Sequence, residues 1–131
     1  MRSVRGAVER LCARFDDGYW LRADREHRFP HEFHQAMAAE GWLGICMPEA
    51  AGGAGLGVIE AAVMMGAVAG SGAGMSGASA IHMNIFGPMP VVVFGTEAQQ
   101  QRMLPPLIAG TERACFAVTE PDAGLDTTRL K

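Results

Sequence analysis

Three short patterns contain residue types that could carry chemistry, and their spacing decides what they can do. Residues 31–34, His-Glu-Phe-His, offer two imidazoles and a carboxylate, but zinc-binding helices place their histidines four apart, and no third ligand is evident. The glycine-rich residues 52–57 lack the G-x-G-x-x-G spacing and the strand–helix unit of a dinucleotide-binding loop. Residues 74–78, Gly-Met-Ser-Gly-Ala, lack the closing glycine of a nucleophile elbow. We therefore expect no metal site and interpret the first two patterns as an exposed helix start and a flexible turn.

A fourth pattern, residues 116–126 with the sequence Phe-Ala-Val-Thr-Glu-Pro-Asp-Ala-Gly-Leu-Asp, is of a different kind. Residues 114–118 are short, apolar and compatible with a strand, and a turn follows at Thr119, Glu120 and Pro121. A strand that ends in a tight turn can present backbone N–H groups and one hydroxyl to a planar heterocycle. Taken alone, the pattern fits an ordinary strand and β-turn equally well. The choice between this interpretation and a ligand-binding segment therefore depends on the rest of the sequence.

This block resembles the flavin-binding signature of acyl-CoA dehydrogenases, in which a strand ends in T-E-P and is followed by A-G and usually S-D. The resemblance covers nearly the whole chain. Further blocks are similar to the first domain of that family, in the same order and spacing: Gly41-Trp42-Leu43-Gly44 with Pro48-Glu49 and Gly52-Gly53, Phe86-Gly87-Pro88-Met89-Pro90, and Phe94-Gly95-Thr96-Glu97 with Leu104-Pro105.

The resemblance implies that the cofactor is FAD and assigns residues to it. Val118 and Thr119 would contact the pyrimidine side of the flavin ring, Thr119 through its hydroxyl, and Phe116 would lie at the ring. Gly124 would allow the backbone to approach closely near the phosphates. Leu125 stands where the family usually has serine, so only its backbone N–H could contribute there, and this departure puts the usual handling of coenzyme A in question.

The resemblance also points to a substrate site. The helix that contains Ser79, His82, Met83 and Phe86 corresponds to the family helix that lines the acyl-chain pocket. His82 and Phe86 are bulky and lie four residues apart, so they share a helix face and are expected to limit the depth of the pocket. The alternative is a packed core helix with a satisfied histidine.

The implied reaction is α,β-dehydrogenation of an acyl-CoA thioester in fatty acid metabolism. A glutamate base removes the α-proton, the β-hydrogen leaves as hydride to the flavin, and an electron-transfer flavoprotein or similar acceptor takes the electrons. In the family this base lies on a later part of the chain, and the full-length protein is usually a homotetramer. We therefore assign no catalytic residue and expect the chain alone to be an inactive fragment. The glutamates excluded as the base are Glu9, Glu49, Glu60, Glu97, Glu112 and Glu120.

Two other functional classes stay open at this point. Flavin monooxygenases, and relatives that do not dehydrogenate, use the same scaffold, and a truncated helical module without catalysis is also possible.

The composition of the chain further restricts its possible functions. The 131 residues are 49% hydrophobic and 19% charged, which is typical of a globular protein, and the net charge of −3 provides no basic surface for nucleic acid. Three widely spaced cysteines without a C-x-x-C pair suit a reducing compartment, so we expect a cytoplasmic protein.

The elements that must position these residues are predicted to be mainly α-helical. Residues 1–113 should form an amino-terminal helical domain, and residues 114–131 the start of a middle β domain with its first strand. Apolar periodicity, prolines, glycines and a Thr96–Gln99 capping box predict helical segments at residues 4–15, 30–41, 58–69, 76–86, 88–95 and 96–110.

The nearly charge-free residues 61–95 form the longest apolar stretch of the chain. Serines, His82, Asn84, two prolines and many glycines interrupt it, so we expect closely packed helices without a membrane span. Gly66, Gly70 and Gly74 repeat at four-residue spacing and should let helix backbones approach closely. The residues Asp16, Asp17 and Gly18 are expected to end the first helix.

Overall fold

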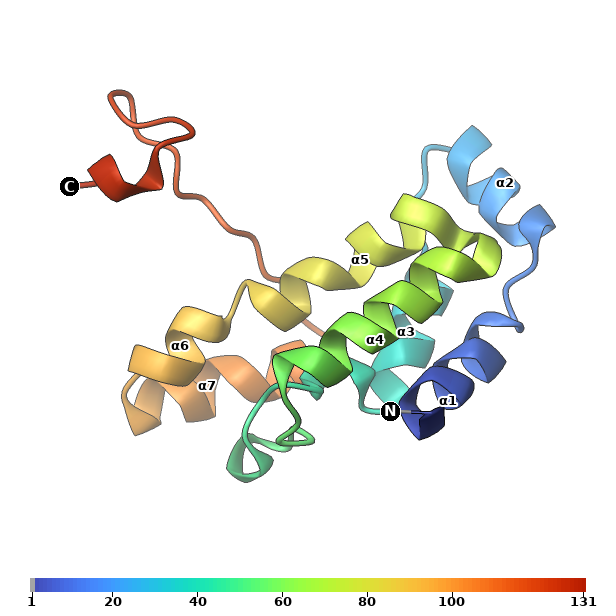
Figure 1. Ribbon diagram of the computed structural model, residues 1–131, viewed down its shortest axis with the longest axis horizontal. Helices are drawn as coiled ribbons and strands as arrows, with labels where there is room; N and C mark the ends of the chain where they lie inside the picture. Colours follow the sequence, from blue (N-terminus) through green and yellow to red (C-terminus); the bar gives the residue numbers. More distant parts are fainter. Residues whose placement is uncertain (1) are drawn as a thin grey trace.

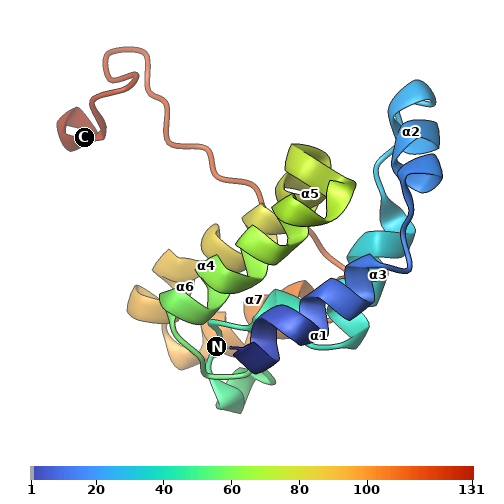
Figure 2. The same ribbon diagram turned by 45° about the vertical axis from the view of Figure 1, so that its right-hand side comes forward.

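The computed structural model describes residues 2–131, and its regular structure is helical (Figure 1). In chain order the elements are α1 (Arg2–Cys12), α2 (Asp17–Arg25), α3 (His31–Ala39), the 3-10 turns η1 (Trp42–Gly44) and η2 (Glu49–Ala51), α4 (Val58–Val68), the π-helical turn η3 (Ala69–Ala73), α5 (Gly74–Phe86), α6 (Met89–Phe94), α7 (Glu97–Ile108) and the 3-10 turn η4 (Thr127–Arg129). Helices α4 and α5 run antiparallel through the middle, with α1 and α3 on one side and α6 and α7 at one end (Figures 1 and 2). The predicted mainly helical fold is confirmed.

The first helix buries the face that its apolar spacing predicted. Val8, Leu11 and Cys12 are at most 2% exposed, and Val4 and Phe15 pack at the edge of the same core. This core lies mainly between α1, α3, α4 and α5. Burial of these apolar side chains stabilises the packing of the four helices.

Helix α2 was not predicted, because Asp16, Asp17 and Gly18 were expected only to end the first helix. In the structure Asp16 caps the next helix, and its carboxylate accepts a hydrogen bond of 2.8 Å from the backbone N–H of Tyr19. Asp is among the preferred N-cap residues, since its side chain satisfies an N–H group that the helix start leaves unpaired.

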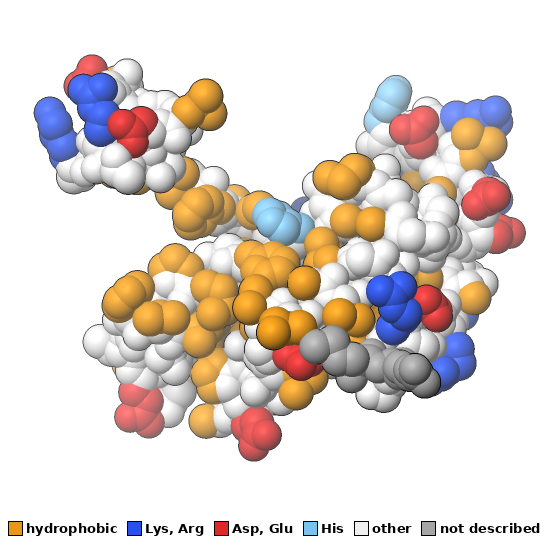
Figure 3. All heavy atoms as spheres, in the orientation of Figure 1, with side chains coloured by type: hydrophobic (Ala, Val, Ile, Leu, Met, Phe, Trp, Pro, Cys, Tyr) orange, Lys and Arg blue, Asp and Glu red, His pale blue; other side chains and the backbone are white. Residues whose placement is uncertain are grey.

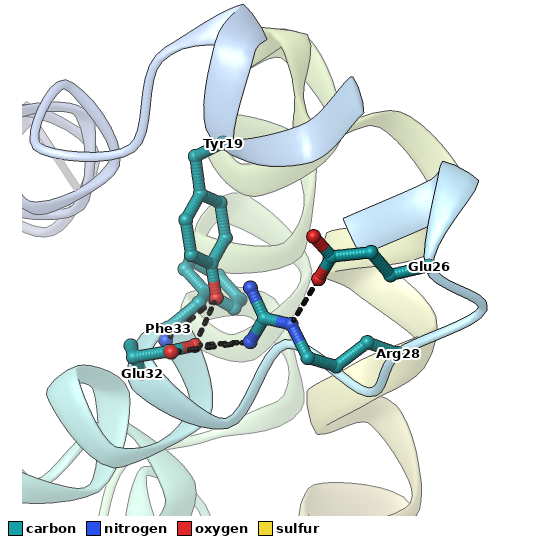
Figure 4. Close-up of polar contacts among 5 residues, drawn as sticks. All are labelled: Tyr19, Glu26, Arg28, Glu32 and Phe33. Carbon is teal, nitrogen blue, oxygen red and sulfur yellow. Dashed lines mark hydrogen bonds and ion pairs between the residues drawn. The ribbon is translucent and has the colours of Figure 1, made fainter. Parts of the chain in front are cut away.

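A polar network joins α2 to the first turn of α3 (Figure 4). The Glu32 carboxylate accepts hydrogen bonds from Arg28 at 2.8 Å and from the Tyr19 hydroxyl at 2.9 Å, and Arg28 also contacts Glu26 at 3.3 Å. The Tyr19 oxygen in turn accepts a bond of 3.4 Å from the backbone N–H of Phe33. The hydrogen bond from Arg28 first, then that from the backbone of Glu32 itself and that from Tyr19, lower the pKa of Glu32 from 4.5 to about 2.

The connection between α3 and α4 is irregular and apolar, as the sequence indicated. Leu43, Ile45 and Met47 are fully buried. The chain then folds back on itself, and an added Cβ at Gly53 would come within 2.2 Å of the Met47 carbonyl oxygen. Only glycine fits at this contact.

Helices α4 and α5 form a hairpin through η3. The turn is made by Gly72 and Gly74, whose φ angles of +88° and +55° favour glycine. The prediction that Gly66, Gly70 and Gly74 mark a close helix approach is wrong, because a Cβ at any of the three would meet nothing within 4 Å. The close contact between α4 and α5 is at Gly77, where a Cβ would lie 3.2 Å from Cγ1 of Val68 on α4.

The run from Val58 to Phe94 is long and apolar enough, by length and composition alone, to cross a membrane, and 28% of its most apolar window is buried. The run is bent back at η3, however, and α4 has 11 residues. Such a helix rises about 16 Å, roughly half the thickness of a bilayer core. The hairpin therefore does not have the form of a single spanning helix.

Helices α6 and α7 form a smaller second core. The predicted capping box is present: the Thr96 hydroxyl oxygen accepts from the Gln99 backbone N–H at 3.3 Å, and the Gln99 side chain accepts from the Thr96 backbone N–H at 2.8 Å. Leu104 and Leu107 are buried against Met47, as their spacing in the sequence indicated. Helix α7 ends at Ile108. Gly110 follows with a φ of +70°, and the prediction that this glycine ends the helix is confirmed.

The predicted first β strand is not confirmed. No strand is assigned between residues 2 and 131, and residues 114–118 run as extended chain away from the helices (Figures 1 and 2). A strand requires a neighbour for its hydrogen bonds, and residues 114–118 form no bridge with another part of the described chain. The predicted turn is present, because the backbones of Glu120 and Ala123 exchange two hydrogen bonds of 3.2 Å.

Candidate functional site

The carboxyl-terminal segment is attached to the helices through one buried amide. The Asn84 side chain on α5 is 2% exposed. Its Nδ2 donates to the carbonyl oxygens of Leu107 at 3.1 Å and Glu112 at 3.0 Å, and its Oδ1 accepts from the backbone N–H of Ala114 at 3.1 Å. Asn84 therefore fixes where the segment leaves the end of α7. Asn84 was not predicted as a site residue, although an amide in a nearly charge-free helix was the available signal.

Directly after Ala114 the backbone N–H groups of the segment are unpaired as far as Thr119. Among the residues described, none of the N–H groups of residues 115–119 donates a hydrogen bond to the rest of the chain. The Thr119 hydroxyl also has no partner there, and Phe116 is 56% exposed, while Val118 is half-buried. The segment thus presents a row of free donors that ends in a hydroxyl.

The turn after this row leaves space around its glycine. A Cβ at Gly124 would meet nothing within 4 Å, so another molecule can approach the backbone there. Leu125 is fully exposed, and its side chain offers no hydrogen bond. The structure therefore brings the predicted flavin residues together on one exposed segment, without a second wall from the helices.

The two predicted substrate residues lie together on α5. The rings of His82 and Phe86 are 5.5 Å apart, centroid to centroid, with an angle of 45° between their planes. His82 lines a largely apolar hollow of about 390 Å³ between α4 and α5, together with Met65 and Met75. Phe86 is not among its lining residues and packs at the edge of the main core.

An apolar surface extends over α4, α5 and α6 beside this hollow (Figure 3). Val58 and Ile59 are more than half exposed, Met75 is 77% exposed and Phe94 is 85% exposed. Contiguous apolar surface of this kind is typical of a region that another protein surface covers.

The described residues offer little for nucleophilic or metal chemistry. Burial raises the pKa of the Cys12 and Cys46 thiols, so both are less reactive than a free cysteine. Residues 2–131 contain no group of three His, Cys, Asp or Glu side chains that could hold a metal ion. In the pattern at residues 31–34, His31 is exposed and His34 is buried.

Comparison with known proteins identifies the family. Residues 1–111 match the family described as "Acyl-CoA dehydrogenase, N-terminal domain". The chain belongs to the acyl-CoA dehydrogenase family. This membership makes it part of an oxidoreductase family of flavoproteins in fatty acid metabolism, and it accounts for the helical domain that the structure shows.

Individual relatives agree with this assignment. Acyl-CoA dehydrogenase FadE12 of Mycobacterium tuberculosis is 32% identical over 133 residues, which is 98% of this chain and 33% of its own length. The probable acyl-CoA dehydrogenase YngJ of Bacillus subtilis is 38% identical over 103 residues, 79% of this chain and 27% of its own. Acryloyl-CoA reductase (NADH) of Anaerotignum propionicum is 38% identical over 109 residues, which is 82% of this chain and 27% of its own length. The chain therefore spans a third or less of the length of these relatives.

Proposed function

We propose that this chain forms the amino-terminal part of an FAD-dependent acyl-CoA dehydrogenase that acts on the α,β carbon–carbon bond of an acyl-CoA thioester. The observation that carries the proposal is the row of unpaired N–H groups at residues 115–119, which ends at the Thr119 hydroxyl. In a member of this family, such exposed N–H groups and a hydroxyl can donate hydrogen bonds to the edge of a flavin ring.

The residues present suit FAD. The free N–H groups and the Thr119 hydroxyl match the acceptors on the pyrimidine side of a flavin, and the apolar side chains of Phe116 and Val118 can lie against its ring. Gly124 has space for a close approach by the phosphates, and Leu125 contributes its backbone N–H. Bound FAD would supply the hydride acceptor. The chain's own residues bind and orient the cofactor, and no residue here is proposed as the base.

The apolar hollow beside His82 is the proposed start of the acyl-chain site. Its volume of about 390 Å³ and its methionine lining suit an alkyl chain. Phe86 would act by holding the His82 ring, since the two rings are in contact and only His82 lines the hollow. Replacing both residues by alanine should shift preference towards longer acyl chains, and an unchanged chain-length profile would show that this face is only core.

The direction of the reaction is a second question, because one relative is named as a reductase. Dehydrogenation and reduction act on the same carbon–carbon bond, so the partner that exchanges electrons sets the direction. We propose an electron-transfer flavoprotein or similar acceptor as partner, a cytoplasmic location, and a homo-oligomer that covers the apolar surface of α4 to α6. A monooxygenase or a non-catalytic helical module on the same scaffold would not be reduced by an acyl-CoA.

The test uses the natural gene product that contains this chain, purified with and without Thr119→Val. We expect the wild type to bind FAD and to lose its flavin absorbance when acyl-CoA is added without oxygen. Thr119→Val should weaken FAD binding several-fold, since a net hydrogen bond contributes about 1 kcal/mol. Thr127→Val is the matched control in the same segment, and it should bind FAD like the wild type. Equal FAD affinity in Thr119→Val and Thr127→Val would refute the assigned role of Thr119.

A further inference from the structure

A buried histidine on α3 has a ring nitrogen without a hydrogen-bond partner. His34 is 3% exposed, and its Nε2 is buried with no partner. Buried ring nitrogens are normally paired, so an unpaired one points to a missing partner. Burial first, and then the positive charges of Arg113 and His31, lower the pKa of His34, which favours the neutral ring.

His34 lines a hollow of about 410 Å³ between the start of α3 and the chain after α7. The carbon next to Nε2, Cε1, lies against Gly110, because a Cβ added at Gly110 would be 3.3 Å from it. The other polar side chains that line the hollow carry no negative charge. They are His31, Gln35, Thr111, whose hydroxyl donates to the Pro106 carbonyl oxygen at 3.1 Å, and Arg113.

No carboxylate lines this hollow. Glu32, in the same turn of α3 as His31, is engaged by Arg28 and Tyr19. Glu112 does not line this hollow. It lines a neighbouring hollow with Arg102, and Arg113 borders both. The Arg113 guanidinium lies 4.5 Å from the centre of the Phe29 ring and has no carboxylate partner within 4.0 Å among the described residues.

We propose that this hollow binds a small oxyanion, a phosphoryl or a carboxylate group, between His34, His31 and Arg113. The anion would accept from the Arg113 guanidinium and provide the acceptor that Nε2 lacks. Guanidinium is well suited to either group because its donors form a planar fork.

The site lies at the base of the carboxyl-terminal segment. Arg113 stands between Glu112 and Ala114, both of which are bonded to Asn84. Holding Arg113 on an anion therefore also orders the connection from which the segment leaves. This inference is independent of the proposed flavin site, since none of the residues at 115–125 lines the hollow.

The experiment follows backbone amide and imidazole signals of the 131-residue chain by NMR during titration with sulfate or with acetate. Ionic strength is held constant with sodium chloride. Sulfate stands in for a phosphoryl group and acetate for a carboxylate, so the tighter of the two identifies the ligand chemistry. We expect saturable shifts at Gly110 and Thr111 with at least one of them. No saturable shift with either anion would overturn the proposal.

Two variants distinguish anion binding in this hollow from a general effect of the positive charge of the protein. Arg113→Gln should weaken anion binding about tenfold, as the loss of a charge-assisted hydrogen bond implies. Arg102→Gln removes the same charge outside the hollow, and it should bind like the wild type. The pKa of His34, which is faced by His31 and Arg113, should rise when the anion is bound, because the anion favours the charged ring. Equal affinity of the two variants, or an unchanged pKa of His34, would contradict the site.

Discussion

The helices at residues 2–110 and the segment at residues 114–131 obtain their structure in different ways. In the helices, large side chains such as Phe33, Met64 and Ile85 are fully buried among one another. In the segment, Ala123 alone is buried, and a row of backbone N–H groups has no partner within the described chain. The helical part is therefore specified by its own contacts, whereas the segment makes few contacts with the rest of the described chain.

The largest effect should come from a core aromatic ring. Phe33 is fully buried and packs edge-to-face with Phe15 and Trp20, at centroid distances of 5.4 and 5.1 Å. Phe33→Ala should lower the free energy of unfolding by about 3–5 kcal/mol. Phe116→Ala, in the segment, should leave it unchanged within error. Urea unfolding of both variants measures this, and a comparable loss in Phe116→Ala would remove the distinction between the two parts.

The second effect concerns the amide that joins the two parts. Asn84→Ala leaves the carbonyl oxygens of Leu107 and Glu112 and the N–H of Ala114 without their partner. We expect a loss of about 2–3 kcal/mol and faster hydrogen exchange at Ala114. Gln101→Ala removes an exposed amide on α7 and is the control, with exchange at Ala114 unchanged. Slow exchange at Ala114 in Asn84→Ala would mean that the segment is anchored by something else.

The sequence predicts the features of the fold that depend on local signals, and it fails where a feature depends on contacts with another part of the chain. The apolar spacing in α1 and α7 and the capping box at Thr96 are local signals, and the structure agrees with each of them. The prediction failed at α2, because Asp16 can end one helix or begin the next, and the choice depends on Tyr19 packing against Phe15. The expected strand is not confirmed for a related reason, since a strand forms only with a neighbour.

The residues of the candidate site also differ in how far the sequence alone reveals them. The motif around Thr119 was visible in the sequence because its residues are contiguous. Asn84 was missed because its partners lie 23 to 30 residues away in the chain, and only the fold brings them together. The role of Gly66 and Gly70 was misjudged, since their spacing does not say which helix face points outwards.

A smaller effect should come from the capping box of α7. Thr96→Ala removes the hydroxyl that accepts from the Gln99 backbone N–H, and it should lower the free energy of unfolding by about 1 kcal/mol. Thr119→Ala removes a hydroxyl with no partner in the described chain, so it should have no such effect. Thermal unfolding followed by circular dichroism compares the two. A loss in Thr119→Ala as large as that in Thr96→Ala would show that the segment is part of the folded core.

The smallest effect should be the dependence of stability on pH at the contact between α2 and α3. The hydrogen bond from Arg28, with those from the backbone of Glu32 and from Tyr19, holds the pKa of Glu32 at about 2 instead of 4.5. Because the folded pKa is lowered, the contribution of Glu32 is complete above about pH 4.5 and is lost as the pH falls towards 2. The carboxylate is exposed, so the contribution is small and should weaken in high salt. The difference in unfolding midpoint between wild type and Glu32→Gln should therefore shrink over this range. Midpoints that stay parallel down to pH 2 would show that the network of Figure 4 adds no pH-dependent stability to the helices.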